Sequence, residues 1–185
     1  RKAEEGRLAL GTMDSWLVYR LTKGNACRTD VSNASRTQLL NLETLRWDEE
    51  LCGLFGIPVQ ALAEVADSDA CFGDTDLDGY LEHPVPILGV LGDSHGALFG
   101  QGCIRPGMIK ATYGTGSSLM MNIGRKPIRS SHGVVTSVAW GMGGEVTYCL
   151  EGNLNYTGAV ISWLKNDLHL IQNAAQTQQD AYAAN

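Results

Sequence analysis

The second half of the sequence contains the succession of segments that most constrains the fold. A continuous apolar run at 85–91 is followed by the small-residue stretch 94–102, and then by two pairs of probable strands, each pair joined by a glycine-rich turn. The run predicts a buried strand, the small-residue stretch predicts a helix, and the pairs predict hairpins over 108–122 and 134–150. This order predicts an α/β domain with a mixed sheet rather than a purely parallel one.

The remaining segments predict short helices joined by polar stretches. Residues 28–33 are polar and predict a turn, the acidic stretch 67–78 is expected on the surface, and 82–84 have the composition of a linker. Asp48 is expected to cap the helix that follows it. Helices are predicted where apolar residues recur at helical spacing between capping residues, at 11–22, 48–54, 59–65, 157–171 and 173–184.

The composition argues against several classes of protein. Lys and Arg number 14 against 20 Asp and Glu, a net charge of −6 that disfavours nucleic acid and anionic membranes as partners. No apolar run approaches the roughly 18–20 residues that span a bilayer. The five cysteines form no C-x-x-C pair, which argues against zinc and against a disulfide framework, and favours a reducing cytoplasm. The four histidines have no metal-ligand spacing, so no metal site is predicted.

The 22 glycines are the unusual figure in the composition. Glycine usually makes up about 7% of a sequence, and here its share is clearly higher without any Gly-X-Y period. The glycines are therefore expected at tight turns and where another group comes close to the backbone.

The predicted strand at 85–91 leads into the next helix through the pentapeptide Gly92-Asp93-Ser94-His95-Gly96. Folds of the α/β class place ligands at the C-terminal ends of strands, and a helix N-terminus favours a charged carboxylate. Asp93 is therefore a candidate base that accepts the proton of a substrate hydroxyl. The alternative is that Asp93 only caps the helix.

The same pentapeptide matches G-x-S-x-G, the nucleophile elbow of α/β-hydrolases, with Ser94 as the nucleophile. His132 and His169 are available as its base. No oxyanion loop precedes the motif, however, and hairpins follow it where a hydrolase alternates strands with helices. The hydrolase interpretation is kept as the alternative from another class of enzyme.

Two further glycine-containing segments could approach a ligand. Thr115 lies between Gly114 and Gly116 in the first hairpin turn, where backbone N–H groups and a hydroxyl suit phosphate oxygens. Gly158 lies near a helix start and leaves room for a flat group, with Ser162 one turn further on the same face. Both features also occur in proteins that bind nothing there.

An acidic residue at the end of a predicted strand, a glycine–threonine hairpin and a glycine at a helix start, in this order, resemble the FGGY family of carbohydrate kinases, and its glycerol kinases most closely. The resemblance runs over almost the whole chain. It is carried by the segments Gly11–Leu17, Asn33–Thr37, Gly92-Asp93, Ala97–Gln101, Thr112–Gly116, Ala139–Gly141, Leu150–Gly152 and Gly158 through Trp163-Leu164.

This resemblance implies a ribonuclease-H-like, actin-like ATPase fold, in which ATP and substrate bind between two domains. Residues 1–82 would form the C-terminal part of the first domain, and residues 83–185 the first part of the second. The chain lacks an initiating Met and ends in a helical pattern without a cap. We therefore expect a fragment from the middle of a longer protein, inactive by itself.

The resemblance also implies ATP-dependent phosphorylation of a hydroxyl of a polyol or sugar, with ATP and Mg²⁺ required. Asp93 would be catalytic and take the proton from the attacking hydroxyl. The other site residues that the resemblance implies are Ser94 and Ser118, with Asp93, for the substrate, and Gly114, Thr115, Gly158 and Ser162 for the nucleotide. The sequence shows no dedicated carboxylate cage for the metal. Family members are often homo-oligomers, and the same is expected of the full-length protein.

The sequence departs from the glycerol kinase pattern at three of these positions. Ser94 and Ser162 stand where Gln is usual, and Ser118 stands where an aromatic residue is usual. Ser118 makes the predicted pocket larger and more polar, which suits a longer polyol or a sugar. A sugar kinase of the xylulokinase type is therefore the alternative within the family.

Overall fold

The computed structural model describes residues 2–3 and 5–184 of the chain, which form short helices and strands. The helices are α1 Met13–Leu21, α2 Val31–Ala34, α3 Glu49–Leu54, the 3-10 helix η1 Val59–Ala61, α4 Asp93–Gly100, α5 Gly158–Asn166 and α6 Ala174–Ala183. The strands are β1 Arg28–Asp30, β2 Leu40–Asn41, β3 Arg46–Trp47, β4 Glu64–Ala66, β5 Asp74–Thr75, β6 Val85–Pro86, β7 Ile109–Tyr113, β8 Ser117–Gly124, β9 Val135–Met142 and β10 Glu145–Leu154. No helix within these described ranges is long and apolar enough to cross a membrane.

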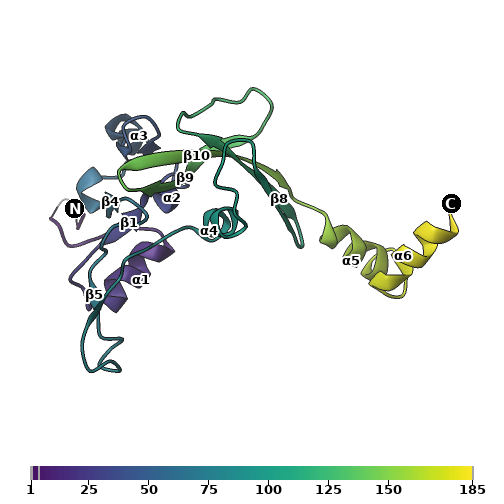
Figure 1. Ribbon diagram of the computed structural model, residues 1–185, viewed down its shortest axis with the longest axis horizontal. Helices are drawn as coiled ribbons and strands as arrows, with labels where there is room; N and C mark the ends of the chain where they lie inside the picture. Colours follow the sequence, from purple (N-terminus) through teal and green to yellow (C-terminus); the bar gives the residue numbers. More distant parts are fainter. Residues whose placement is uncertain (1, 4, 185) are drawn as a thin grey trace.

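These elements form an elongated molecule (Figure 1). The first half of the chain, in purple and blue, gathers beside one end of the long hairpin β9–β10. Helix α4 lies below the sheet in this view, and β10 leads away from the body to α5 and α6, which project at the opposite end.

The hairpins predicted over 108–122 and 134–150 are confirmed. They form one four-stranded antiparallel sheet in the order β7-β8-β10-β9. Gly143 and Gly144 connect β9 to β10 with φ of 60° and 75°, the left-handed backbone that tight hairpin turns favour. Strands β1 and β4 pair in parallel. The described chain therefore contains both strand directions, but in separate sheets, whereas the sequence predicts one mixed sheet.

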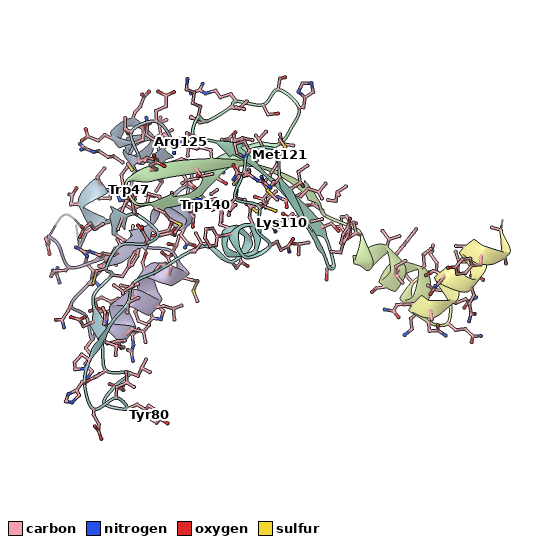
Figure 2. The ribbon with its side chains drawn as sticks, in the orientation of Figure 1. Trp47, Tyr80, Lys110, Met121, Arg125 and Trp140 are labelled. Carbon is pink, nitrogen blue, oxygen red and sulfur yellow. The ribbon has the colours of Figure 1, made fainter. Side chains whose placement is uncertain are left out.

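Two small cores lie on opposite faces of this sheet. On one face Leu98 of α4 belongs to a cluster with Met120 and Cys149. On the other face Val31 of α2 clusters with Tyr148. Neighbouring residues of a strand point to opposite faces, so β10 contributes Cys149 to one core and Tyr148 to the other. The sheet thereby joins the first half of the chain to α4 (Figure 2).

One capping residue of the first half acts as predicted. Asp48 caps α3, because its carboxylate accepts the N–H groups of Glu50 and Leu51. Thr12 precedes α1, but its hydroxyl bonds the Asp14 side chain rather than the helix backbone.

The turn predicted for residues 28–33 is wrong. These residues form β1, which pairs with β4, and the start of α2. Asp30 makes the difference, because its fully buried carboxylate accepts the N–H groups of Ser32 and Asn33. An aspartate in this position begins a helix, where polar composition alone suggested a turn.

Two neighbouring predictions are right only in part. Helical structure at 59–65 is limited to η1, and β4 follows because residues 64–66 pair with β1. The acidic stretch 67–78 has exposed residues such as Asp69 and Asp78, but Phe72 in its middle is fully buried.

The buried strand predicted at 85–91 is wrong. Only Val85–Pro86 form a strand, which pairs with β5, and Leu88 is 61% exposed. Pro86, the one proline within 85–91, has no N–H to donate to a strand ladder, and β6 ends at this residue. The apolar stretch instead makes isolated backbone hydrogen bonds with residues 68–73.

The helix predicted for 157–171 ends earlier than expected. Helix α5 stops at Asn166, α6 begins at Ala174, and His169 between them has a left-handed φ of 53°. None of the described side chains of α5 and α6 is buried. The apolar residues Val160 and Trp163 of α5 are therefore open to solvent, at 38% and 50% exposed.

Candidate functional site

Asp93 is the first residue of α4, and it is exposed at the N-terminus of that helix. Gly92 occupies the N-cap position, and the Asp93 carboxylate accepts the N–H of Ser94 at 2.6 Å. The structure therefore presents an accessible base here, although residues 87–91 before it are not part of the buried strand that the sequence predicts for 85–91.

A buried hydrogen-bond network holds the backbone that precedes Asp93. The Gly92 N–H donates to the Ser32 hydroxyl at 2.9 Å, and that hydroxyl donates to an Asp30 carboxylate oxygen, also at 2.9 Å. Ser68 donates to the other Asp30 oxygen at 2.7 Å. Ser32 and Asp30 are fully buried. The first half of the chain thus positions Asp93 through Gly92.

His95 lies two residues after Asp93 and is buried between α4 and the sheet. Its Nε2 lies 3.3 Å from the Ser137 hydroxyl on β9. Burial, and then the positive charge of Arg36, lower the pKa of His95 to about 4, so the imidazole is neutral at pH 7. The sequence alone indicates no role for His95, because the environment of this residue exists only once α4 packs on the sheet.

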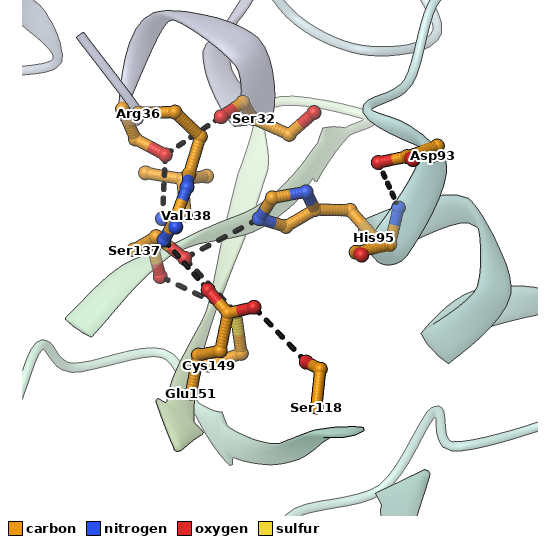
Figure 3. Close-up of polar contacts among 11 residues, drawn as sticks. Ser32, Arg36, Asp93, His95, Ser118, Ser137, Val138, Cys149 and Glu151 are labelled. Atoms are coloured by element: carbon orange, nitrogen blue, oxygen red, sulfur yellow. Dashed lines mark hydrogen bonds and ion pairs between the residues drawn. The ribbon is translucent and has the colours of Figure 1, made fainter. Parts of the chain in front are cut away.

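Glu151 on β10 is a buried carboxylate with two partners (Figure 3). Arg36, just after α2, pairs with Glu151 Oε2 at 2.8 Å, and the Ser118 hydroxyl on β8 donates to Oε1 at 3.0 Å. A buried carboxylate needs such partners, because its desolvation is otherwise unfavourable. Ser118, predicted to contact substrate, is thus joined to a charge pair that the sequence analysis did not identify.

Asp93 and Ser118 belong to elements that pack on one another. Ser118 and Met120 share one face of β8, because alternate residues of a strand do so. Met120 in turn clusters with Leu98 of α4. Helix α4 therefore covers the sheet face that carries Ser118, and its first residue is Asp93 (Figure 3).

The Gly114–Gly116 turn joins β7 to β8 and receives the start of α5. The Gly158 N–H donates to the Gly114 carbonyl, and the Ala159 N–H donates to the Thr115 carbonyl, each at 3.0 Å. A Cβ on Gly158 would lie 2.5 Å from the Gly114 oxygen, so only glycine lets the helix dock in this way. Room for a ligand beside Gly158 stays a prediction.

Thr115 and Ser162 are exposed on this docked pair of elements. Among the described residues, nothing bonds to the Thr115 hydroxyl. A free hydroxyl beside exposed backbone at a glycine-rich turn suits a phosphate oxygen. Contact of Gly114, Thr115, Gly158 and Ser162 with a nucleotide stays a prediction.

Ser94 lacks the surroundings of a hydrolase nucleophile. Within the described part of the chain its hydroxyl bonds neither His132 nor His169, and His132 interacts with Ser131 in an exposed loop. The adjacent His95 is directed to Ser137 instead. The geometry gives the hydrolase alternative no base.

A metal ion would find few ligands in this part of the molecule. Residues 2–3 and 5–184 contain no group of three or more His, Cys, Asp or Glu side chains that could hold one. Mg²⁺ bound with a nucleotide, however, usually needs only one or two protein carboxylates beside the phosphates. The exposed Asp93 is compatible with that smaller requirement.

Comparison with known proteins finds relatives over nearly the whole chain. The model of the N-terminal domain of the FGGY family of carbohydrate kinases matches residues 1–100, and that of its C-terminal domain matches residues 109–185. Glycerol kinase 1 of Thermotoga maritima is 52% identical over 180 residues, which cover 97% of this chain and 36% of that protein. The chain spans about a third of the length of the curated relatives it matches.

Solved structures share the fold. The crystal structure of Plasmodium falciparum glycerol kinase with ADP matches with a TM-score of 0.86 and 36% identity, over 95% of this chain and 35% of that one. A ligand-bound xylulose kinase from Lactobacillus acidophilus matches with a TM-score of 0.71 and 22% identity, over 85% of this chain and 32% of that one. The second likeness shows the fold alone. The expected actin-like α/β fold is confirmed, whereas a domain boundary near residue 83 stays a prediction.

Proposed function

The chain belongs to the FGGY family of carbohydrate kinases, and on that premise we propose that the protein transfers the γ-phosphoryl group of ATP to a hydroxyl of a polyol. The observation that carries the proposal is the exposed carboxylate of Asp93 at the N-terminus of α4. It lies in a chain about half identical to glycerol kinases.

Asp93 is the catalytic residue in this proposal. Its carboxylate accepts the proton of the attacking hydroxyl, the hydroxyl oxygen bonds to the γ-phosphorus, and the bond to ADP breaks. Phosphoryl transfer depends mainly on positioning and on neutralisation of charge. The bonds from Asp30 through Ser32 to Gly92 support this role, because they fix the backbone from which Asp93 extends.

The turn at Gly114 and Thr115 is the proposed contact for the nucleotide phosphates, and Gly158 and Ser162 are the proposed residues beside the nucleotide. The exposed Thr115 hydroxyl and the docking of α5 on the turn support this assignment. Mg²⁺, when bound with ATP, neutralises phosphate charge, and Asp93 is the proposed site residue whose carboxylate would help to hold it.

Ser94 and Ser118 are the proposed substrate contacts together with Asp93. A kinase for a keto sugar of the xylulose type is the second candidate, favoured by the polar Ser118 at a position where glycerol kinases usually carry an aromatic residue. We further propose a homo-oligomer in a reducing cytoplasm, without nucleic acid or membrane as partner. Five cysteines that all remain free thiols support that compartment.

The replacement Asp93→Asn tests the catalytic assignment in the complete protein that carries this chain. An amide cannot accept the proton, so kcat is expected to fall by at least about 10²-fold. ADP release is measured over a panel of polyols and ketoses. Ser94→Ala is the companion variant, and it should change the preference among substrates while phosphorylation persists.

The same two variants separate the kinase from the hydrolase interpretation. Loss of all activity in Ser94→Ala, together with labelling of Ser94 by a fluorophosphonate, would establish a serine hydrolase and contradict the proposal. Binding of ATP without turnover of any acceptor would instead indicate a binding module that keeps the fold.

A further inference from the structure

The contacts of Ser118 determine the direction of its hydroxyl proton. Ser118 Oγ donates to Glu151 Oε1 at 3.0 Å, while Glu151 Oε2 pairs with Arg36 at 2.8 Å. A serine hydroxyl carries one proton, and an ionised carboxylate can only accept hydrogen bonds. The single proton of Ser118 is therefore committed to Glu151.

The sheet register makes this arrangement rigid. Glu151 pairs across the ladder with Met120, and Ser118 lies two residues from Met120 on the same face of β8. Diagonal neighbours of this kind are within side-chain reach. The Glu151 side chain is 8% exposed, so water competes little for its oxygens. Ser118 and Glu151 both lie on strands of the sheet, so neither of these two residues depends on a loop for its position.

The lone pairs of Ser118 are what remain for a ligand. Ser118 is partly exposed on the face that α4 covers, and α4 begins with Asp93. A substrate group that meets Ser118 must then donate a hydrogen bond. A hydroxyl on a polyol carbon can donate a hydrogen bond, whereas the carbonyl oxygen of a keto sugar can only accept one. A carbonyl oxygen beside Ser118 would therefore place two hydrogen-bond acceptors together without a proton between them, which is unfavourable.

We propose that Glu151 is a positioning residue that makes Ser118 an acceptor-only contact, so that the site selects polyols over the corresponding keto sugars. This inference rests on the proposed kinase function and deepens it, because it decides between the two substrate classes left open above. The polar Ser118, which by itself favours a sugar, acquires the opposite preference through its bond to Glu151.

The test compares pairs of substrates that differ only in one group, erythritol with erythrulose and glycerol with dihydroxyacetone. In the complete protein, kcat/KM is expected to favour the polyol of at least one pair by about tenfold or more. In Glu151→Gln the amide can turn its NH₂ group toward Ser118 and release the hydroxyl proton for a carbonyl. The preference is then expected to fall at least fivefold.

A double-mutant cycle tells positioning from general damage. If Glu151 acts through Ser118, the variant Ser118→Ala loses the same preference, and adding Glu151→Gln to it changes nothing further. Glu151→Asp is the second variant should Glu151→Gln fold poorly. It keeps a negative charge beside Arg36 but withdraws the carboxylate from Ser118, and it should also lose the preference.

Glu145→Gln is the matched control, since it is the same substitution on the same strand. Glu145 pairs with Arg125 on the surface, and both side chains are largely exposed. The ratio of polyol to ketose activity should stay within twofold of the unaltered protein. An equal loss of preference in Glu145→Gln would overturn the inference.

A binding measurement separates this inference from the proposed function. The rise in melting temperature with added polyol or ketose gives their relative affinities without turnover. Absence of phosphorylation with every acceptor contradicts the proposed function. Equal affinity for both members of each pair, or a preference that persists in both Glu151 variants, contradicts the inference about Glu151.

Discussion

The burial of His95 makes the stability of the protein depend on pH. It is 3% exposed, and burial together with Arg36 lowers the pKa of its imidazole to about 4, against 6.5 when free. Between these values the unfolded chain binds a proton that the folded chain does not bind. Stability therefore rises with pH across this window, is fully present above pH 6.5, and is lost as pH falls toward 4.

The replacement His95→Gln should remove this pH dependence. The unaltered protein is expected to lose roughly 3 kcal/mol of unfolding free energy through this group between pH 7 and pH 4. His95→Gln should show a correspondingly smaller loss in urea unfolding at the two pH values. Measurements at pH 8, where His95 is neutral in both states, isolate the packing change. An unaltered pH slope in the variant would contradict the prediction.

The hydrogen-bonding role of Ser118 depends on its contact with Glu151. Ser118 alone indicates a polar pocket, whereas Ser118 with Glu151 and Arg36 indicates an acceptor of hydrogen bonds. The sequence supplied both residues but not their contact, because they lie on different strands.

Among the elements, α5 is attached to the β7–β8 turn through few contacts. Its first N–H groups donate to the carbonyls of Gly114 and Thr115, and its described side chains are not buried. A helix held mainly at one end depends on that end, so the close approach at Gly158 controls where α5 begins.

Gly158→Ala should loosen this attachment. The added Cβ would lie 2.5 Å from the Gly114 oxygen, and backbone must shift to accommodate it. Amide hydrogen exchange at 158–159 is expected to become faster, and KM for ATP is expected to rise about tenfold if the turn binds phosphates.

Gly53→Ala in α3 is the control for this change. An added Cβ there meets nothing within 4 Å, so the variant should be more stable by roughly 0.5–1 kcal/mol, with KM for ATP unchanged. Unaltered amide exchange at 158–159 in Gly158→Ala would show that the turn accommodates the added Cβ, and it would contradict this prediction.

Local patterns predicted some elements well and others badly. The two hairpins are correct, because strand-like segments on either side of a glycine-rich turn are a property of neighbouring residues. The apolar run 85–91 predicts a buried strand, yet after Pro86 it has no ladder partner among the described residues and is irregular. Apolar composition indicates a tendency to be buried, but a strand also requires a neighbour that accepts its hydrogen bonds.

For the whole molecule, Asp30 connects distant parts of the chain. Ser32 and Ser68 both donate to its carboxylate, Ser32 accepts the Gly92 N–H, and Ser68 accepts the Gly141 N–H at 3.2 Å. This buried centre joins the first half of the chain to α4 and to β9. Its bonds therefore contribute both to stability and to the position of Asp93.

Ser32→Ala should affect stability and catalysis together. The buried Gly92 N–H would lose its acceptor, at about 1–3 kcal/mol of unfolding free energy. Because Gly92 precedes Asp93, kcat is expected to fall more than KM for ATP changes.

Ser130→Ala is the control for Ser32→Ala, because Ser130 accepts the His132 N–H in an exposed loop. Its effect on urea unfolding should stay within about 0.5 kcal/mol. Equal kcat values in Ser32→Ala and the unaltered protein would show that Gly92 does not position Asp93.

The sequence by itself determined the hairpins and the candidates Asp93 and Thr115, because each depends on a short stretch of neighbouring residues. It also determined the family, because several such stretches follow one another in a characteristic order. Only the tertiary structure decided that Asp30 holds Gly92, that His95 is buried and neutral, and that Glu151 joins Arg36 to Ser118. These contacts bring together residues far apart in the chain. Their burial and the direction of their hydrogen bonds arise from packing between elements. Local sequence periodicity cannot predict such packing.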